Sequence, residues 1–61
     1  MAIELNGDGS VTAGGVVLDG SWREVSPGVA YYEDPGVLCT DEMPIADLRQ
    51  KLSEMFSARS R

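Results

Sequence analysis

The sequence contains no histidine, one cysteine and one lysine among its 61 residues. Without histidine a Ser-His-Asp or Cys-His arrangement cannot form, and a single cysteine excludes an internal disulfide and the ligand set of a structural zinc site. The longest aliphatic run is Val16-Val17-Leu18, far shorter than the ~20 residues of a membrane span. We therefore expect no enzymatic activity, no metal and no cofactor, and a cytoplasmic location in a cell or an infected host.

The small size and the charge distribution of the chain indicate how it is stabilised and which partners it can bind. We expect a single domain over residues 1–61, and a domain this small buries only about 60% of its unfolded surface. Because neither a disulfide nor a metal can stabilise the fold, association with a second copy or with a partner is the means that remains, so we expect a homo-oligomer or a protein partner. Residues 1–40 carry six acidic and one basic side chain, or −5, whereas residues 41–61 carry four of each sign. Such a surface repels nucleic acid and anionic lipid and favours a basic partner, so we expect no direct binding to nucleic acid or membrane.

One segment, residues 40–58, has the periodicity of an amphipathic helix. Its apolar side chains recur at steps of three and four residues and form a single stripe. The stripe comprises Ile45, Leu48, Leu52, Met55 and Phe56. A helix of this length is marginal alone in water, so the stripe must be buried against the rest of the chain or a partner.

The start of this helix carries capping signals. Thr40 or Asp41 can cap it, Asp41 and Glu42 suit the positive end of the helix dipole, and Pro44 fits the first turn. No glycine stops the other end, and we expect residues 59–61 to form a frayed basic tail.

The pattern of residues 1–39 predicts short strands separated by turns. Asn6-Gly7-Asp8-Gly9 and Asp19-Gly20 are hairpin signals, and Gly14-Gly15 either ends a strand or bulges it. Ser26-Pro27-Gly28-Val29 and Asp34-Pro35-Gly36-Val37 fit type II turns. The regular spacing of these turns predicts an α+β fold, with an antiparallel β-meander of three to five strands and one C-terminal helix packed on one face. Cys39 follows an apolar pair, and we expect it to be a small core residue.

The segment from Asn6 to Thr12 resembles the middle of an EF-hand or dockerin calcium loop over about seven residues. The resemblance would make Glu4, Asn6 and Asp8 the first, third and fifth ligands and would place Gly15 at the twelfth position. That last position normally holds a bidentate carboxylate, so the main ligand is missing. We expect a plain hairpin turn and no metal site.

The aromatic side chains of the sheet suggest where a partner binds. Adjacent residues on a strand face opposite sides, so one of Tyr31 and Tyr32 can pack under the helix while the other stays on the open face. An exposed tyrosine near Trp22 on an acidic sheet is typical of a protein-binding patch. The predicted partner-binding residues are Trp22, Glu24, Tyr31, Tyr32, Glu33 and Asp34.

Together these features predict a non-enzymatic protein-interaction protein. The segment I-E-L-N-G-D-G-S-V-T resembles strand-turn-strand segments of phage tail-fibre proteins over about ten residues, and small acidic chains are common among phage accessory proteins. We therefore expect a phage-type accessory factor, such as an inhibitor, that binds and modulates a host protein. The alternatives are a small structural subunit of a virion-like assembly and an acidic nucleic-acid mimic, with Asp19, Glu24, Glu33 and Asp34 supplying spaced negative charge.

Overall fold

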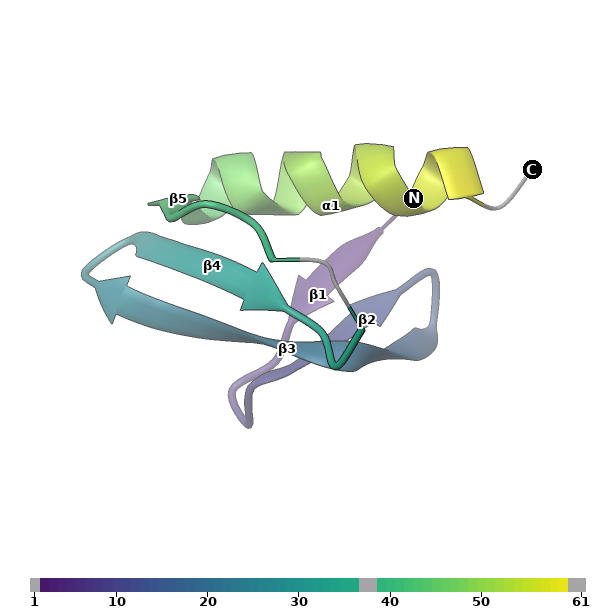
Figure 1. Cartoon of the computed structure of the whole chain (residues 1–61), viewed down its shortest axis with the longest axis horizontal. Helices are drawn as coiled ribbons and strands as arrows, with labels where there is room; N and C mark the ends of the chain where they lie inside the picture. The colour runs from purple at the N-terminus through teal and green to yellow at the C-terminus, as the bar shows by residue number, and fades with distance from the viewer. Residues whose placement is uncertain (1, 37–38, 60–61) are drawn as a thin grey trace.

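A computed structural model describes residues 2–36 and 39–59 of the chain. Five antiparallel strands form one curled sheet in sequence order, and the helix α1 (Ile45–Arg59) packs across one of its faces (Figure 1). The strands are β1 (Ile3–Leu5), β2 (Ser10–Ala13), β3 (Val16–Ser26), β4 (Val29–Glu33) and β5 (Met43–Pro44). The predicted α+β meander with a C-terminal helix is confirmed.

The first hairpin, between β1 and β2, forms where the sequence predicts it. Asn6 N donates to Ser10 O at 2.9 Å and Gly9 N donates to Asn6 O at 3.0 Å. Gly9 has a φ of 94°, a conformation that only glycine adopts without cost. Asp8 Oδ1 accepts a bond from Ser10 N at 2.9 Å and one from Ser10 Oγ at 2.7 Å. The turn is therefore fixed by backbone and side-chain bonds together.

The second hairpin lies at Gly14-Gly15, and the prediction that Asp19-Gly20 forms a hairpin is wrong. Gly14 and Gly15 have φ of 57° and 84° and lie between the paired residues Ala13 and Val16. Two successive positive φ values are what a two-residue type I′ turn needs. Gly20 instead lies inside β3, where a Cβ would overlap the hydroxyl of Tyr32. The missing side chain at Gly20 therefore leaves room for the Tyr32 ring, and the residue does not form a turn.

The two Pro-Gly segments behave differently. Gly28 has a φ of 80°, as the turn between β3 and β4 requires, and its N–H donates to the carboxylate of Glu24 at 2.9 Å. Gly36 is not among the described glycines with positive φ, so the second segment does not form the predicted type II turn. It bends instead around Asp34, whose Oδ1 accepts a bond from Gly36 N at 2.9 Å. Val37, the last residue of that predicted turn, lies outside the described residues.

The helix begins at Ile45, five residues later than predicted, because the preceding segment pairs with β4. Thr40 N donates to Tyr32 O at 2.8 Å, and Thr40 Oγ1 accepts a bond from Tyr32 N at 2.9 Å. Met43 and Pro44 continue this pairing as β5. A residue before proline is disfavoured from helical geometry, so the helix cannot extend back through Met43.

Two further expectations about this part of the chain need correction. Asp41 and Glu42 precede β5 and do not lie in the first helical turn, where Asp47 is the acidic residue. Cys39 is exposed and pairs with Glu33 in an isolated bridge, so it is not a core residue. The helix continues to Arg59, so the first residue of the tail predicted over residues 59–61 is helical, and residues 60 and 61 lie outside the described residues.

The core lies between the helix and the face of the sheet that the helix covers (Figure 1). Its fully buried side chains are Val11, Ala30, Tyr32, Leu48 and Leu52. Tyr32 meets the ring of Phe56 edge to face, with centroids 6.1 Å apart. Four of the five residues of the predicted stripe therefore pack in or against the core: Leu48 and Leu52 at its centre, with Ile45 and Phe56 beside them, whereas Met55 is half-buried outside this cluster.

Candidate protein-binding surface

Strand β4 separates the two adjacent tyrosines. Tyr32 points under the helix and is 1% exposed, so its place among the predicted partner-binding residues is wrong: the core already encloses it. Tyr31 projects from the other side of the strand and is partly exposed. The prediction that one tyrosine is core and the other faces outward is confirmed, and the structure assigns them.

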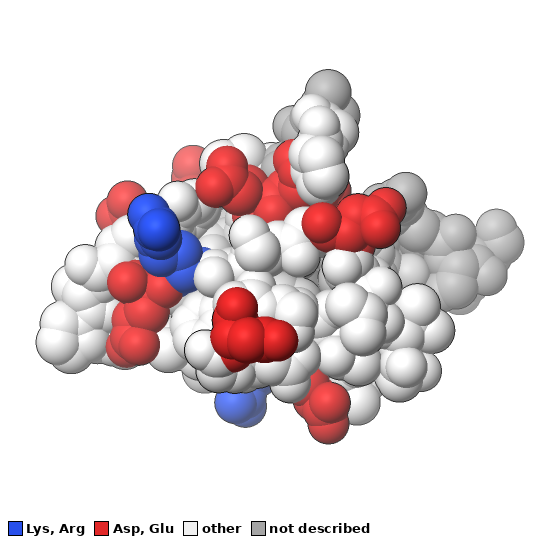
Figure 2. Space-filling view, turned by 90° about the horizontal axis from the view of Figure 1, so that it is seen from below, with Lys and Arg blue, Asp and Glu red and all other residues white. Residues whose placement is uncertain are grey.

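The open face, the side of the sheet opposite the helix, presents four side chains of β3 and β4 together. Ser21 pairs with Glu33, and Arg23 pairs with Tyr31, so alternate residues of both strands project on this side. Figure 2 views the molecule from this side and shows carboxylate groups spread over the surface with few basic groups among them. Arg23 brings the one basic side chain of residues 1–40 into this group.

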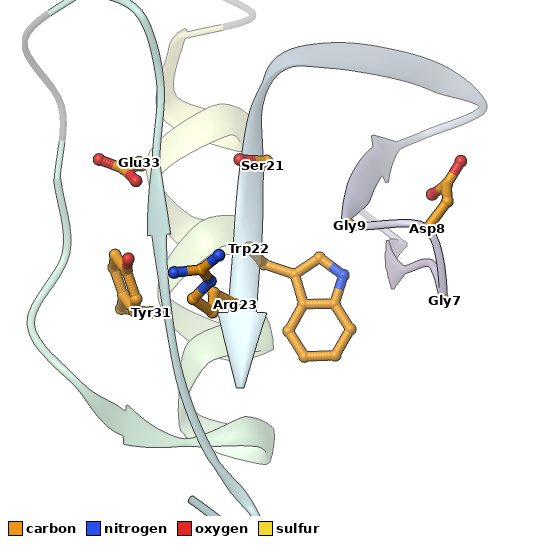
Figure 3. A pocket seen from close by; sticks show the side chains of 8 residues that line it. All are labelled: Gly7, Asp8, Gly9, Ser21, Trp22, Arg23, Tyr31 and Glu33. Carbon is orange, nitrogen blue, oxygen red and sulfur yellow. The ribbon is translucent and has the colours of Figure 1, made fainter. Parts of the chain in front are cut away.

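A hollow of about 480 Å³ lies beside these side chains, where the turn between β1 and β2 approaches β3 and β4 (Figure 3). The hollow is lined by Gly7, Asp8, Gly9, Ser21, Trp22, Arg23, Tyr31 and Glu33. In Figure 3 Tyr31, Arg23 and Glu33 project from neighbouring strands, and Trp22 extends sideways toward the turn. Three elements therefore contribute to one surface.

Trp22 belongs to both the core and the hollow. It pairs with Tyr32 on the inner side of the sheet, and its half-buried ring packs against the core cluster. Its indole N–H donates to the carbonyl of Asn6 at 2.8 Å, and its backbone N–H donates to Gly9 O at 3.0 Å. These bonds tie β3 to the first turn. They hold the turn in the position where it forms one wall of the hollow.

Asp8 brings a fixed negative charge to the edge of the hollow. The side-chain hydrogen bond from Ser10, followed by the backbone bond from the same residue, lowers the pKa of the Asp8 carboxyl below its ordinary value. Hydrogen bonds to a carboxylate favour its charged form. Asp8 is therefore ionised throughout the neutral range.

The other two predicted residues have local structural roles. Glu24 accepts the bond from Gly28 N and Asp34 the bond from Gly36 N, so each carboxylate supports the turn beside it. Neither lines the hollow. Of the six predicted residues, the structure brings together Trp22, Tyr31 and Glu33.

Sequence reasoning missed Arg23 and Asp8 as members of this surface. Arg23 was visible as the one basic residue of the acidic half, but its pairing with Tyr31 depends on the register of β3 and β4. The sequence presents Asp8 as a turn residue and as the fifth position of the calcium-loop resemblance, and neither suggests a place on this surface. Its place beside Trp22 depends on a long-range contact, the indole bond to Asn6, for which the sequence has no local signal.

No described group of three or more histidine, cysteine, aspartate or glutamate side chains is arranged to hold a metal. Within the described residues, no helix is long and apolar enough to cross a membrane. Comparison with models of known protein families, with curated proteins and with solved structures gave no match to this chain.

Proposed function

We propose that this chain is a non-enzymatic protein-binding protein that docks its partner on the open face, around the hollow. The observation that supports this most is that Trp22 and Tyr31 line one hollow. Tryptophan and tyrosine are among the residue types that contribute most often to the energetic centres of protein interfaces. The helix covers the opposite side of the sheet, so it does not block access to the open face.

The more specific form of the proposal is an accessory factor of the phage type, which modulates a host protein by binding it. Its support is the acidic charge, −5 in total, together with a hollow that Trp22 and Tyr31 help to line. Rim charges of one sign speed the encounter with an oppositely charged partner, while a buried aromatic side chain slows dissociation. A host protein with a basic rim and an apolar pocket would suit this surface.

Affinity capture with matched variants tests the proposal. Wild-type chain, Tyr31→Ala and Lys51→Glu are immobilised and exposed to a lysate of the native host. Lys51 is exposed on the helix, on the side of the molecule opposite the open face. We expect a partner that Lys51→Glu retains and Tyr31→Ala loses, with at least a fivefold drop in affinity for an interface residue worth about 1–2 kcal/mol. Equal retention by both variants would overturn the proposal.

A second candidate is a small structural subunit of a larger assembly. It is favoured by Val16 and Val17, which begin β3 and are 64% and 65% exposed. Exposed aliphatic side chains take part in subunit association where a neighbouring subunit completes an apolar patch around them. Sedimentation of the isolated chain separates the two functions, since an assembly subunit should oligomerise and Val17→Ser should then restore the monomer.

A further inference from the structure

The hollow combines aromatic and acidic side chains in a way that indicates the chemistry of its occupant. Trp22 and Tyr31 supply aromatic rings, and Asp8 and Glu33 supply carboxylates. Its volume of about 480 Å³ is within the range of small-ligand sites, about 300–1,000 Å³. That is enough for one long side chain together with the backbone that carries it.

We infer that the hollow receives an arginine or lysine side chain from a basic segment of a partner protein. This inference rests on the proposed function and names the chemistry of the contact. A guanidinium or ammonium group is attracted to the faces of tryptophan and tyrosine rings and to carboxylates. The hollow offers both kinds of group to a single inserted side chain.

The charges favour a cation over an anion. Glu33 and Arg23 lie together on one side of Trp22, and the Asp8 carboxylate lies at the first turn on its other side (Figure 3); the three charges sum to −1, and the whole chain carries −5. Ser10 holds the Asp8 carboxylate through its N–H and its hydroxyl, so this charge is fixed in position. An approaching anion would meet repulsion from the chain as a whole, whereas a basic segment would be drawn toward it.

Arg23 has a defined part in this arrangement. It lies in the hollow beside Tyr31 and Glu33. There its side chain fills part of the space, and its positive charge offsets part of the negative charge that would attract an incoming cation. A guest arginine or lysine therefore competes with Arg23. Removal of the Arg23 charge should strengthen the binding of a cation and weaken the binding of an anion. The direction of the change in affinity therefore distinguishes the two occupants.

The test is a titration of the isolated full chain with a defined probe, the peptide acetyl-Gly-Arg-Gly-Arg-Gly-amide, followed by the indole N–H resonance of Trp22. The matched control peptide replaces both arginines with norleucine. We expect saturable shifts at Trp22 and Tyr31 with the arginine peptide and none with its control. The absence of a saturable shift at millimolar peptide, or saturation confined to the helix, would overturn the inference.

Three single-charge variants sharpen the result. Glu33→Gln should weaken peptide binding about threefold, and Arg23→Gln should strengthen it by about twofold to threefold, as expected for charges several ångströms apart near water. Glu42→Gln removes the same charge outside the lining of the hollow and should change binding less than Glu33→Gln does. Weaker binding by Arg23→Gln, or equal effects of the two glutamate variants, would contradict a cation in the hollow.

The same variants separate this inference from the proposed function. Suppose that Tyr31→Ala loses the captured partner while Glu33→Gln and Arg23→Gln bind both partner and peptide like the wild type. The open face is then the interface, but the inference that a basic side chain enters the hollow is wrong. If Tyr31→Ala retains the partner, the proposed function itself fails. Self-association that depends on concentration and that Glu33→Gln abolishes would show that a second copy of the chain enters the hollow. That result would overturn the inference that a different protein supplies the basic side chain.

Discussion

Tyr31 and Tyr32 are neighbours in sequence, yet they belong to opposite sides of the molecule. Tyr32 is enclosed by the helix and packs edge to face on Phe56, whereas Tyr31 lines a solvent-open hollow with Trp22 and Arg23. The strand geometry alone separates them, because successive side chains point to opposite faces. The comparison teaches that one five-residue strand supplies both the core that stabilises the fold and the surface that we propose binds a partner.

Truncation of the two tyrosines should give the largest difference. Tyr32→Ala removes a fully buried aromatic side chain and should cost about 3–5 kcal/mol, most of the stability of a chain this small. Tyr31→Ala lies on the open face and should change the free energy of unfolding by less than about 1 kcal/mol. Urea denaturation followed by circular dichroism measures both. Equal destabilisation by the two variants would show that the faces are not distinct.

Truncation of a buried helix residue should destabilise the fold as Tyr32→Ala does. Leu52 is fully buried between the helix and the sheet, and Leu52→Ala should cost about 2–5 kcal/mol through lost burial and the cavity that remains. We expect the loss of cooperative thermal unfolding. The matched control is Gln50→Ala on the exposed side of the same helix, which should unfold like the wild type. A wild-type melt for Leu52→Ala would mean that the helix does not pack on the sheet.

Gly20 makes room for the Tyr32 ring. A Cβ at this position would lie 2.5 Å from the carbonyl oxygen of Glu33 as well as overlapping the tyrosine, so backbone must shift. Gly20→Ala should therefore destabilise by about 1–3 kcal/mol, as overpacked sites do. Gly7→Ala is the control, because a Cβ there meets nothing within 4 Å. Should both variants melt alike, Gly20 would not be needed for the ring.

The smallest expected effect concerns the pH dependence of the first turn. The Ser10 bonds lower the pKa of Asp8, so the carboxylate stabilises the fold above the pKa of the unfolded chain, and this contribution is lost as the pH falls through the lower folded value. The Ser10 amide resonance should titrate in acid together with the Asp8 carboxyl. In Asp8→Ala that titration should vanish, while the neutral-pH spectrum of the helix stays unchanged. A persistent titration at Ser10 would assign it to another group.

The sequence was informative where one local rule decided the structure. The spacing from Ile45 to Phe56 predicted the buried stripe, and the Asn6 to Gly9 segment predicted the first turn. It failed where two local signals competed. Gly14-Gly15 and Asp19-Gly20 both suit a hairpin, and only the close approach of Tyr32 to Gly20 explains why the second pair lies within a strand.

The candidate surface was predictable only in part, because its assembly depends on strand register. Alternation showed that one tyrosine faces outward, but it could not say which one. The pairing of Arg23 with Tyr31 and the bond from Trp22 to Asn6 join residues that are eight and sixteen positions apart. Local patterns carry no information at that range, so Arg23 and Asp8 were found only in the structure.

Site-specific photo-crosslinking tests the central claim most directly. The photoreactive residue p-benzoylphenylalanine replaces Tyr31 on the open face in one variant and Lys51 on the helix in another, and each is irradiated in a lysate of the native host. Position 31 retains an aromatic side chain, so the interface should persist. We predict a discrete covalent adduct from position 31 and none from position 51. An adduct from position 51 alone would contradict the assignment of the open face as the binding surface.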